Sequence, residues 1–186
     1  MKRLAVLATF VVITLSSTST FAVTPLRHDL LSAKQVPHWS KYYIAAAQTA
    51  GCPESTFDKP TSTSAVREVF VQRSSGTLLL ERLGSSAHPA TAYDALLAHM
   101  TKCPKATSTL HGRVTAQSTH PINLGKFAEP VRAYTISAEV GNTNVSGVVA
   151  YAKKGHVVFA LAELSLERLN LPSFRALLRE ALAKTP

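Results

Sequence analysis

Residues 131–140 alternate apolar and polar side chains with the two-residue period of a β-strand. Residues 145–153 and 156–164 are the next two strand-like segments, and only a few residues separate each one from the segment before it. Links this short require antiparallel pairing, because parallel strands need a crossover of a dozen or more residues. A further hairpin is predicted from residues 66–73 and 77–83, with a glycine in its turn.

Helical spacing of apolar residues marks three other segments. Residues 89–102 begin with a proline, which suits the first position of a helix, and their apolar stripe leads to Cys103. A closing helix opens at Leu171 and continues with apolar residues at helical spacing. A third helix is predicted from Trp39 to Ala50, where Gly51 would serve as the C-terminal cap.

In chain order, these segments read helix, hairpin, helix, strand, meander and helix. The single strand covers residues 110–117, and residues 118–130 are predicted to form a loop. This order is typical of the α+β class, in which helices are segregated from an antiparallel sheet. The prediction is one antiparallel sheet of about six strands with its helices packed on one face.

The first 22 residues have the layout of a secretory signal peptide. A basic start is followed by an apolar run over Leu4–Leu15, and small residues then lead to a cleavage site after Ala22. The run is too short to cross about 30 Å of hydrocarbon as a helix. We therefore expect a secreted protein with three parts, namely a signal peptide (1–22), an N-terminal tail (23–37) and a single domain (38–186).

Export changes how the charge and the cysteines are interpreted. The formal net charge of +9 falls to +7 when Lys2 and Arg3 are removed with the signal peptide. A basic exported protein favours peripheral contact with anionic envelope material, whereas its scattered positive residues argue against nucleic acid. Cys52 and Cys103 are predicted to form a disulfide that closes a loop of 52 residues (103 − 52 + 1). Two free thiols are the alternative.

Motifs for catalysis or for metal binding are not found in the sequence. The seven histidines do not have the spacing of a metal pair on a helix, and the Gly-x-Ser-x-Gly turn of serine hydrolases is missing. Glu139 and Glu163 lie in predicted strands and could face each other, but solvent-facing positions explain them better. We therefore predict no enzyme activity, no cofactor and no metal site.

Aromatic residues offer the best candidates for ligand contact. Trp39, Tyr42 and Tyr43 are clustered in the sequence, and Tyr134 lies in the first strand of the predicted meander. Aromatic rings with a polar edge can line a ligand cleft. The alternative is that the first three residues anchor a helix on the core.

The chain resembles a family in its order of segments. The stretch GTLLLERLGSSAHPATAYDALLAHMTKC (76–103), the stretch GVVAYAKKGHVVFAL (147–161) and the closing helix carry the resemblance. The family is the actinobacterial exported sensor-like domain, typified by the extracellular domain of the mycobacterial serine/threonine kinase PknH and by related lipoproteins. The resemblance implies a non-catalytic sensing or binding domain with an open cleft. This chain departs from it in having one cysteine pair, no kinase and no lipid-anchor cysteine.

Three functions follow as hypotheses. The first is a secreted, non-catalytic binding domain that holds a small or lipid-like ligand, or a cell-envelope component, in a cleft. The second is a basic surface protein that binds anionic wall or membrane material through its net charge. The third is a secreted hydrolase whose nucleophile and base come together only in three dimensions.

Overall fold

The computed structural model describes residues 25–42, 49–50, 64–102, 105–110, 113–140 and 143–186. Its helical elements are η1 (Pro25–His28, a 3-10 helix), α2 (Pro89–Lys102) and α3 (Leu171–Lys184). Its strands are β1 (Ser40–Lys41), β2 (Thr49–Ala50), β3 (Ser64–Gln72), β4 (Thr77–Ser85), β5 (Lys105–Leu110), β6 (Arg113–Ile122), β7 (Val131–Val140), β8 (Thr143–Lys154) and β9 (Val157–Ser165).

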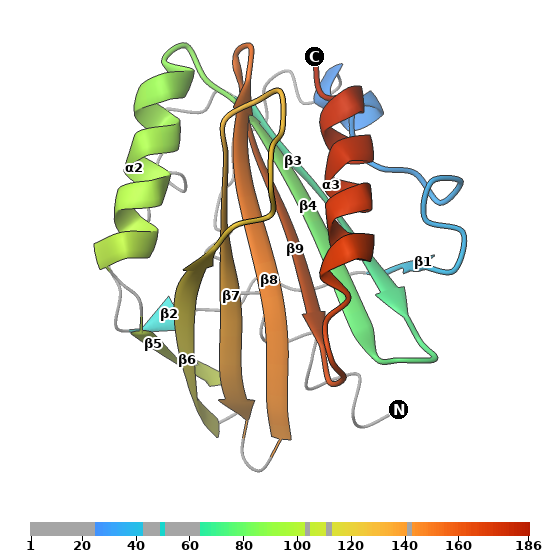
Figure 1. The fold of residues 1–186 in the computed structure, drawn as a ribbon, viewed down its shortest axis with the longest axis vertical. Coiled ribbons are helices and arrows are strands. Elements are labelled where there is room, and N and C mark those ends of the chain that lie inside the picture. Colours follow the sequence, from blue (N-terminus) through green and yellow to red (C-terminus); the bar gives the residue numbers. More distant parts are fainter. Residues whose placement is uncertain (1–24, 43–48, 51–63, 103–104, 111–112, 141–142) are drawn as a thin grey trace.

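All the described strands form one antiparallel sheet in the order β1-β3-β4-β9-β8-β7-β6-β5-β2 (Figure 1). Seven of these strands have six or more residues, and the two outermost strands have two residues each. Most neighbours in the sheet are also neighbours in the sequence. The exception in the centre is the pairing of β4 with β9, which joins the β3–β4 hairpin to the last strand of the meander. The α+β class and the antiparallel sheet are confirmed, with more strands than the six predicted.

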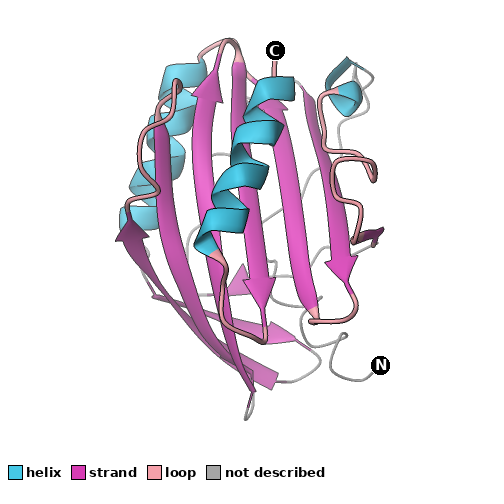
Figure 2. Ribbon diagram, turned by 45° about the vertical axis from the view of Figure 1, so that its right-hand side comes forward, coloured by secondary structure: helices cyan, strands magenta, loops and turns pink. Residues whose placement is uncertain are grey.

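Helix α2 and helix α3 cover opposite faces of the sheet (Figure 2). Along β9 the buried residues alternate between two clusters: Val158 and Ala160 pack with α2, whereas Phe159 and Leu161 pack with α3. The prediction that the helices share one face is therefore wrong.

The burial of the central strands explains why the helices lie on opposite faces of the sheet. Every residue of β9 is buried, as is every residue of β4 from Thr77 to Gly84. Side chains alternate between the two faces of a strand, so an uninterrupted buried run needs cover on both faces. One helix of 14 residues covers each face.

The N-terminal segment (residues 25–37) belongs to the core on the α3 face. Leu26, Leu30, Leu31 and Val36 are buried there. An extended tail was predicted for residues 23–27, whereas Pro25–His28 form a 3-10 helix. Burial of four aliphatic side chains contributes on the order of 1.5–3 kcal/mol each, which is enough to hold such a segment on the sheet.

The predicted helix between Trp39 and Ala50 is also wrong at both of its ends. Residues 40–41 pair with β3, and residues 49–50 pair with β5. The intervening residues 43–48 and Gly51 lie outside the described part of the chain. Helical spacing of small residues did not decide the structure here, because pairing with the open edges of the sheet satisfies the backbone instead.

Other element predictions agree closely with the structure. The strand at 131–140 and the helix at 89–102 have the predicted bounds, and both hairpin turns at Gly76 and Gly155 contain a glycine with positive φ. The sequence missed β5, and β6 extends to Ile122, into the predicted loop. Among the described helices, none is long and apolar enough to span a bilayer.

Candidate functional site

Two adjoining cavities lie where the loop between β6 and β7 meets α3. Their volumes are about 460 Å³ and about 320 Å³. The larger cavity is lined by Asn123, Leu124, Gly125, Leu171, Pro172, Arg175, Ala176 and Arg179. The smaller cavity shares its first three residues and is completed by Ile122, Val131, Arg132 and Ala133. A volume of this size is in the range of small-ligand sites.

The β6–β7 loop, which lines both cavities, is held in place by several contacts. The backbone N–H of Gly125 donates to Oδ1 of Asn123 at 2.7 Å, which is a side-chain-stabilised turn. Gly125 has a φ of +86°, a conformation that other residues adopt only with strain. Leu124 is buried in the α3 core, and the Tyr93 hydroxyl donates to the Pro130 carbonyl at 3.2 Å. The loop is thus held from both faces of the sheet.

Two arginines of α3 line the larger cavity. Arg175 and Arg179 are one helical turn apart, and their guanidinium carbons lie 5.8 Å and 5.7 Å from the centre of the Phe127 ring. The guanidinium of Arg175 also packs on the backbone of Gly125. A Cβ atom at position 125 would lie 2.7 Å from Nη2 of Arg175, so a side chain there would force the guanidinium to move.

The side chains that line the larger cavity carry a net positive charge. Its lining contains two arginines and no acidic residue. In the part of the chain that the structure describes, neither arginine forms an ion pair, and the buried Nε of Arg175 has no hydrogen-bond acceptor. Asn170 caps the start of α3, whose first turn has no carboxylate. The two guanidinium groups therefore present positive charge to whatever occupies the cavity.

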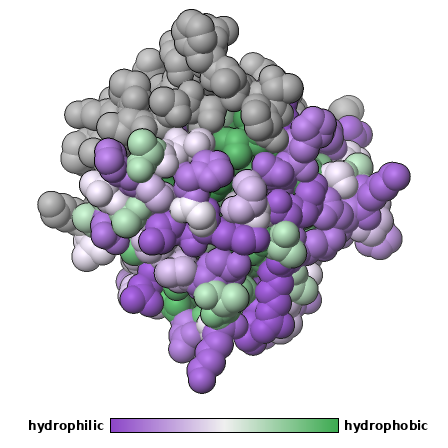
Figure 3. Space-filling model, turned by 90° about the horizontal axis from the view of Figure 1, so that it is seen from above, coloured by the Kyte–Doolittle hydropathy of each residue, from purple (hydrophilic) through white to green (hydrophobic). Residues whose placement is uncertain are grey.

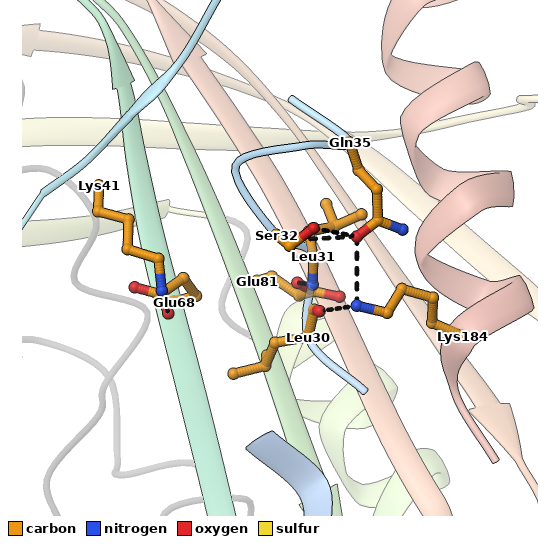
Figure 4. Close-up of polar contacts among 8 residues, drawn as sticks. All are labelled: Leu30, Leu31, Ser32, Gln35, Lys41, Glu68, Glu81 and Lys184. Carbon is orange, nitrogen blue, oxygen red and sulfur yellow. Dashed lines mark hydrogen bonds and ion pairs between the residues drawn. The ribbon is translucent and has the colours of Figure 1, made fainter. Parts of the chain in front are cut away.

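A second polar cluster lies under the N-terminal segment (Figure 4). Glu81 of β4 is fully buried, and its Oε2 accepts a hydrogen bond of 2.6 Å from the backbone N–H of Leu31. Lys184 of α3 donates to the Leu30 carbonyl and to Oε1 of Gln35, the latter at 3.2 Å. Burial raises the pKa of Glu81 to about 7, although the Leu31 N–H and the charge of Lys184 lower it.

Two more glutamates share this face with Glu81. Glu68 stands directly opposite Glu81 in the β3–β4 pair and forms an ion pair of 2.6 Å with Lys41. Glu163 of β9 is buried, and burial raises its pKa to about 7 as well. The expectation that Glu163 faces solvent is therefore wrong. It pairs with Val148, whereas Glu139 pairs with Asn144, so these two glutamates are not cross-strand partners.

The structure separates the aromatic residues that were predicted to contact a ligand. Trp39 packs on the α3 face, whereas Tyr42 and Tyr134 pack on the α2 face, and all three are partly buried. Tyr134 meets Tyr151 edge to face, with ring centres 6.3 Å apart. Tyr43 lies outside the described residues. None of the described three lines either cavity.

The remaining predicted site residues cannot be placed in the fold. Cys52 and Cys103 both lie outside the described residues, so their pairing stays a prediction. Within the described residues, no group of three His, Cys, Asp or Glu side chains could hold a metal ion.

The end of the molecule seen in Figure 3 is dominated by hydrophilic side chains, with small and scattered apolar patches.

Sequence reasoning missed the cavity residues. Arg175 and Arg179 lie in the predicted closing helix, four residues apart. This spacing alone could have indicated that their side chains share one helical face. Their contact with Gly125 and Phe127 was not detectable, because the loop and the helix are about fifty residues apart in the chain. Only the fold brings them together.

Comparison with known proteins yields likenesses to solved structures and none to families or curated sequences. No protein-family model matches the chain, and no curated protein sequence matches it. Among solved structures, the chain is similar to the extracellular domain of PknH from Mycobacterium tuberculosis, with a TM-score of 0.67 and 9% sequence identity. The match covers 91% of this chain and all of that chain. At this identity the likeness shows a shared fold.

Proposed function

We propose that this protein is an exported, non-catalytic binding domain of the sensor-like type, and that its ligand occupies the larger cavity between residues 123–127 and α3. The observation that carries the proposal is the construction of that cavity. Its lining combines apolar side chains, a fixed loop and two arginine side chains without a described ionic partner. A few directed polar groups in an apolar recess are typical of ligand sites.

The fold supports this proposal as an analogy. An extracellular domain with the same fold is known from PknH, and the N-terminal 22 residues of this chain have the layout of a signal peptide. A cell-envelope component, small or lipid-like, is the ligand class that such a location favours. The ligand would be held and released without chemical change.

The side chains around the two cavities favour binding over catalysis. Neither lining contains a serine, cysteine, histidine or carboxylate that could act as a nucleophile or a general base. The buried carboxylates Glu81 and Glu163 lie elsewhere, beneath the α3 face. A binding role uses the donors that the larger cavity offers, whereas a hydrolytic role would need groups that neither lining supplies.

The test is a ligand screen on the secreted protein. Native mass spectrometry after purification from an envelope-containing source, together with thermal-shift measurements against envelope lipids and glycans, should reveal a bound or stabilising compound. A ligand at a hundred times its dissociation constant raises stability by about 2.7 kcal/mol, which is an easily measured shift. If neither method detects a ligand, the proposal is wrong.

A further inference from the structure

We infer that the larger cavity selects ligands through a phosphate group, which Arg175 and Arg179 bind together. This inference rests on the proposed function and narrows its ligand class. The shared chemistry is a phosphate ester, which a soluble metabolite or a lipid headgroup could supply.

The first argument is the placement of charge. Two guanidinium groups flank the same Phe127 ring, each within 5.8 Å of its centre. Two positive charges on one side of a cavity raise its potential and favour an anion as its occupant. Among the described residues no carboxylate pairs with either arginine, and none lines the cavity. A bound phosphate would neutralise one of these charges as a diester and both as a doubly ionised monoester.

The second argument is geometric. The Arg175 guanidinium lies close to Gly125, and a Cβ atom there would displace it. The Asn123 side chain, which fixes this turn, also lines the cavity. The guanidinium is therefore positioned by a glycine contact and an aromatic face at the lining of the cavity. Arginine binds phosphate through paired hydrogen bonds, and a pre-positioned guanidinium loses less freedom on binding.

The third argument concerns the surroundings of the arginines. Leu124, Leu171 and Pro172 add apolar side chains to the lining, which can contact the uncharged part of a phosphate ester. The start of α3 adds a modest positive potential on the same side through the helix dipole, and no carboxylate in its first turn offsets it. Arg132 lines the adjoining cavity and adds a third positive side chain nearby.

The experiment uses the full mature protein and two probes. The first probe is sn-glycerol 3-phosphate, titrated by NMR at low ionic strength, with glycerol as the uncharged control. The second is phosphatidylglycerol vesicles in a co-sedimentation assay, with vesicles of phosphatidylcholine, whose phosphate charge is balanced by choline, as the control. Saturable binding of either probe is expected in the wild type, and the responding probe identifies whether the ester is soluble or lipid-borne.

Matched variants separate the site from general charge. Arg175→Gln and Arg179→Gln should each weaken binding about tenfold or more, as expected for loss of a charge-assisted hydrogen bond. Arg73→Gln removes the same charge from an exposed position in the β3–β4 turn and should leave binding unchanged. Gly125→Ala should also weaken binding by displacing the Arg175 guanidinium, whereas Gly76→Ala, at a comparable φ of 66°, should not. Circular dichroism melts confirm that each variant is folded.

Several outcomes would overturn the inference. Equal weakening by Arg73→Gln would show that the protein binds through its net charge alone. Absence of binding to both probes would remove the phosphate site. Binding of an uncharged envelope lipid or glycan that the Arg175 and Arg179 substitutions do not affect would preserve the proposed function and refute only the phosphate assignment.

Discussion

At the scale of single residues, the buried carboxyl groups of Glu81 and Glu163 strongly influence the stability of the fold. Burial raises the pKa of each carboxyl from 4.5 to about 7. The folded protein therefore binds these two protons more tightly than the unfolded chain does. Their contribution to stability is complete below about pH 4.5 and is lost as the pH rises through 7.

Substitution of Glu81 tests this pH dependence. In the wild type, the free energy of unfolding should fall between pH 5 and pH 8. In Glu81→Gln this fall should shrink by on the order of 2 kcal/mol, because the amide cannot ionise and its oxygen can still accept from the Leu31 N–H. Urea unfolding at the two pH values measures the difference.

The control for this substitution is Glu180→Gln, which removes a carboxylate from the exposed surface of α3. It reports what the loss of one surface charge does at the same two pH values. A wild-type protein that is equally stable at pH 5 and pH 8 would contradict the role given to both buried glutamates.

At the scale of elements, α3 is held by its apolar stripe. Phe174, Leu178, Ala181 and Leu182 are buried against the sheet. Phe174→Ala should lower the free energy of unfolding by about 3–5 kcal/mol, since it removes a fully buried ring. Leu171→Ala on the same helix changes an exposed side chain and should cost about 0.5 kcal/mol or less. Equal effects in chemical denaturation would show that α3 does not pack as described.

The N-terminal segment (residues 25–37) is an element that α3 holds from one side. Lys184 donates to the Leu30 carbonyl and to the Gln35 side chain. Lys184→Met should loosen the segment and raise hydrogen exchange at the Leu31 amide about tenfold, with little effect at β9. Lys34→Met changes an exposed lysine in the same segment and serves as the control. Unchanged exchange at Leu31 would show that Lys184 does not hold the segment.

At the scale of the whole molecule, export and the cross-link remain to be measured. The intact mass of the secreted protein should correspond to cleavage after Ala22, and alkylation without reduction should modify no thiol. Cys52→Ser should lower the free energy of unfolding by about 4 kcal/mol under oxidising conditions, because the 52-residue loop constrains the unfolded chain. The same substitution should have little effect on the reduced protein. Two alkylated thiols in the unreduced sample would disprove the disulfide.

The sequence by itself determined the local elements whose signals are local. Residues 131–140 alternate cleanly, Pro89 opens a helix, and glycines at 76 and 155 mark tight turns, so these elements were predicted with accurate bounds. Such features depend on backbone conformation and on the period of apolar side chains, which neighbouring residues specify. The antiparallel class followed from the short links.

The tertiary structure alone decided which surfaces meet. Two-residue strands at 40–41 and 49–50 exist because the sheet offers open edges there, and a run such as Val157–Ser165 does not reveal which helix covers which face. The recess between Gly125 and Arg175 has the same origin. Contacts between residues far apart in the chain arise from packing of the entire fold, and no local pattern encodes that packing.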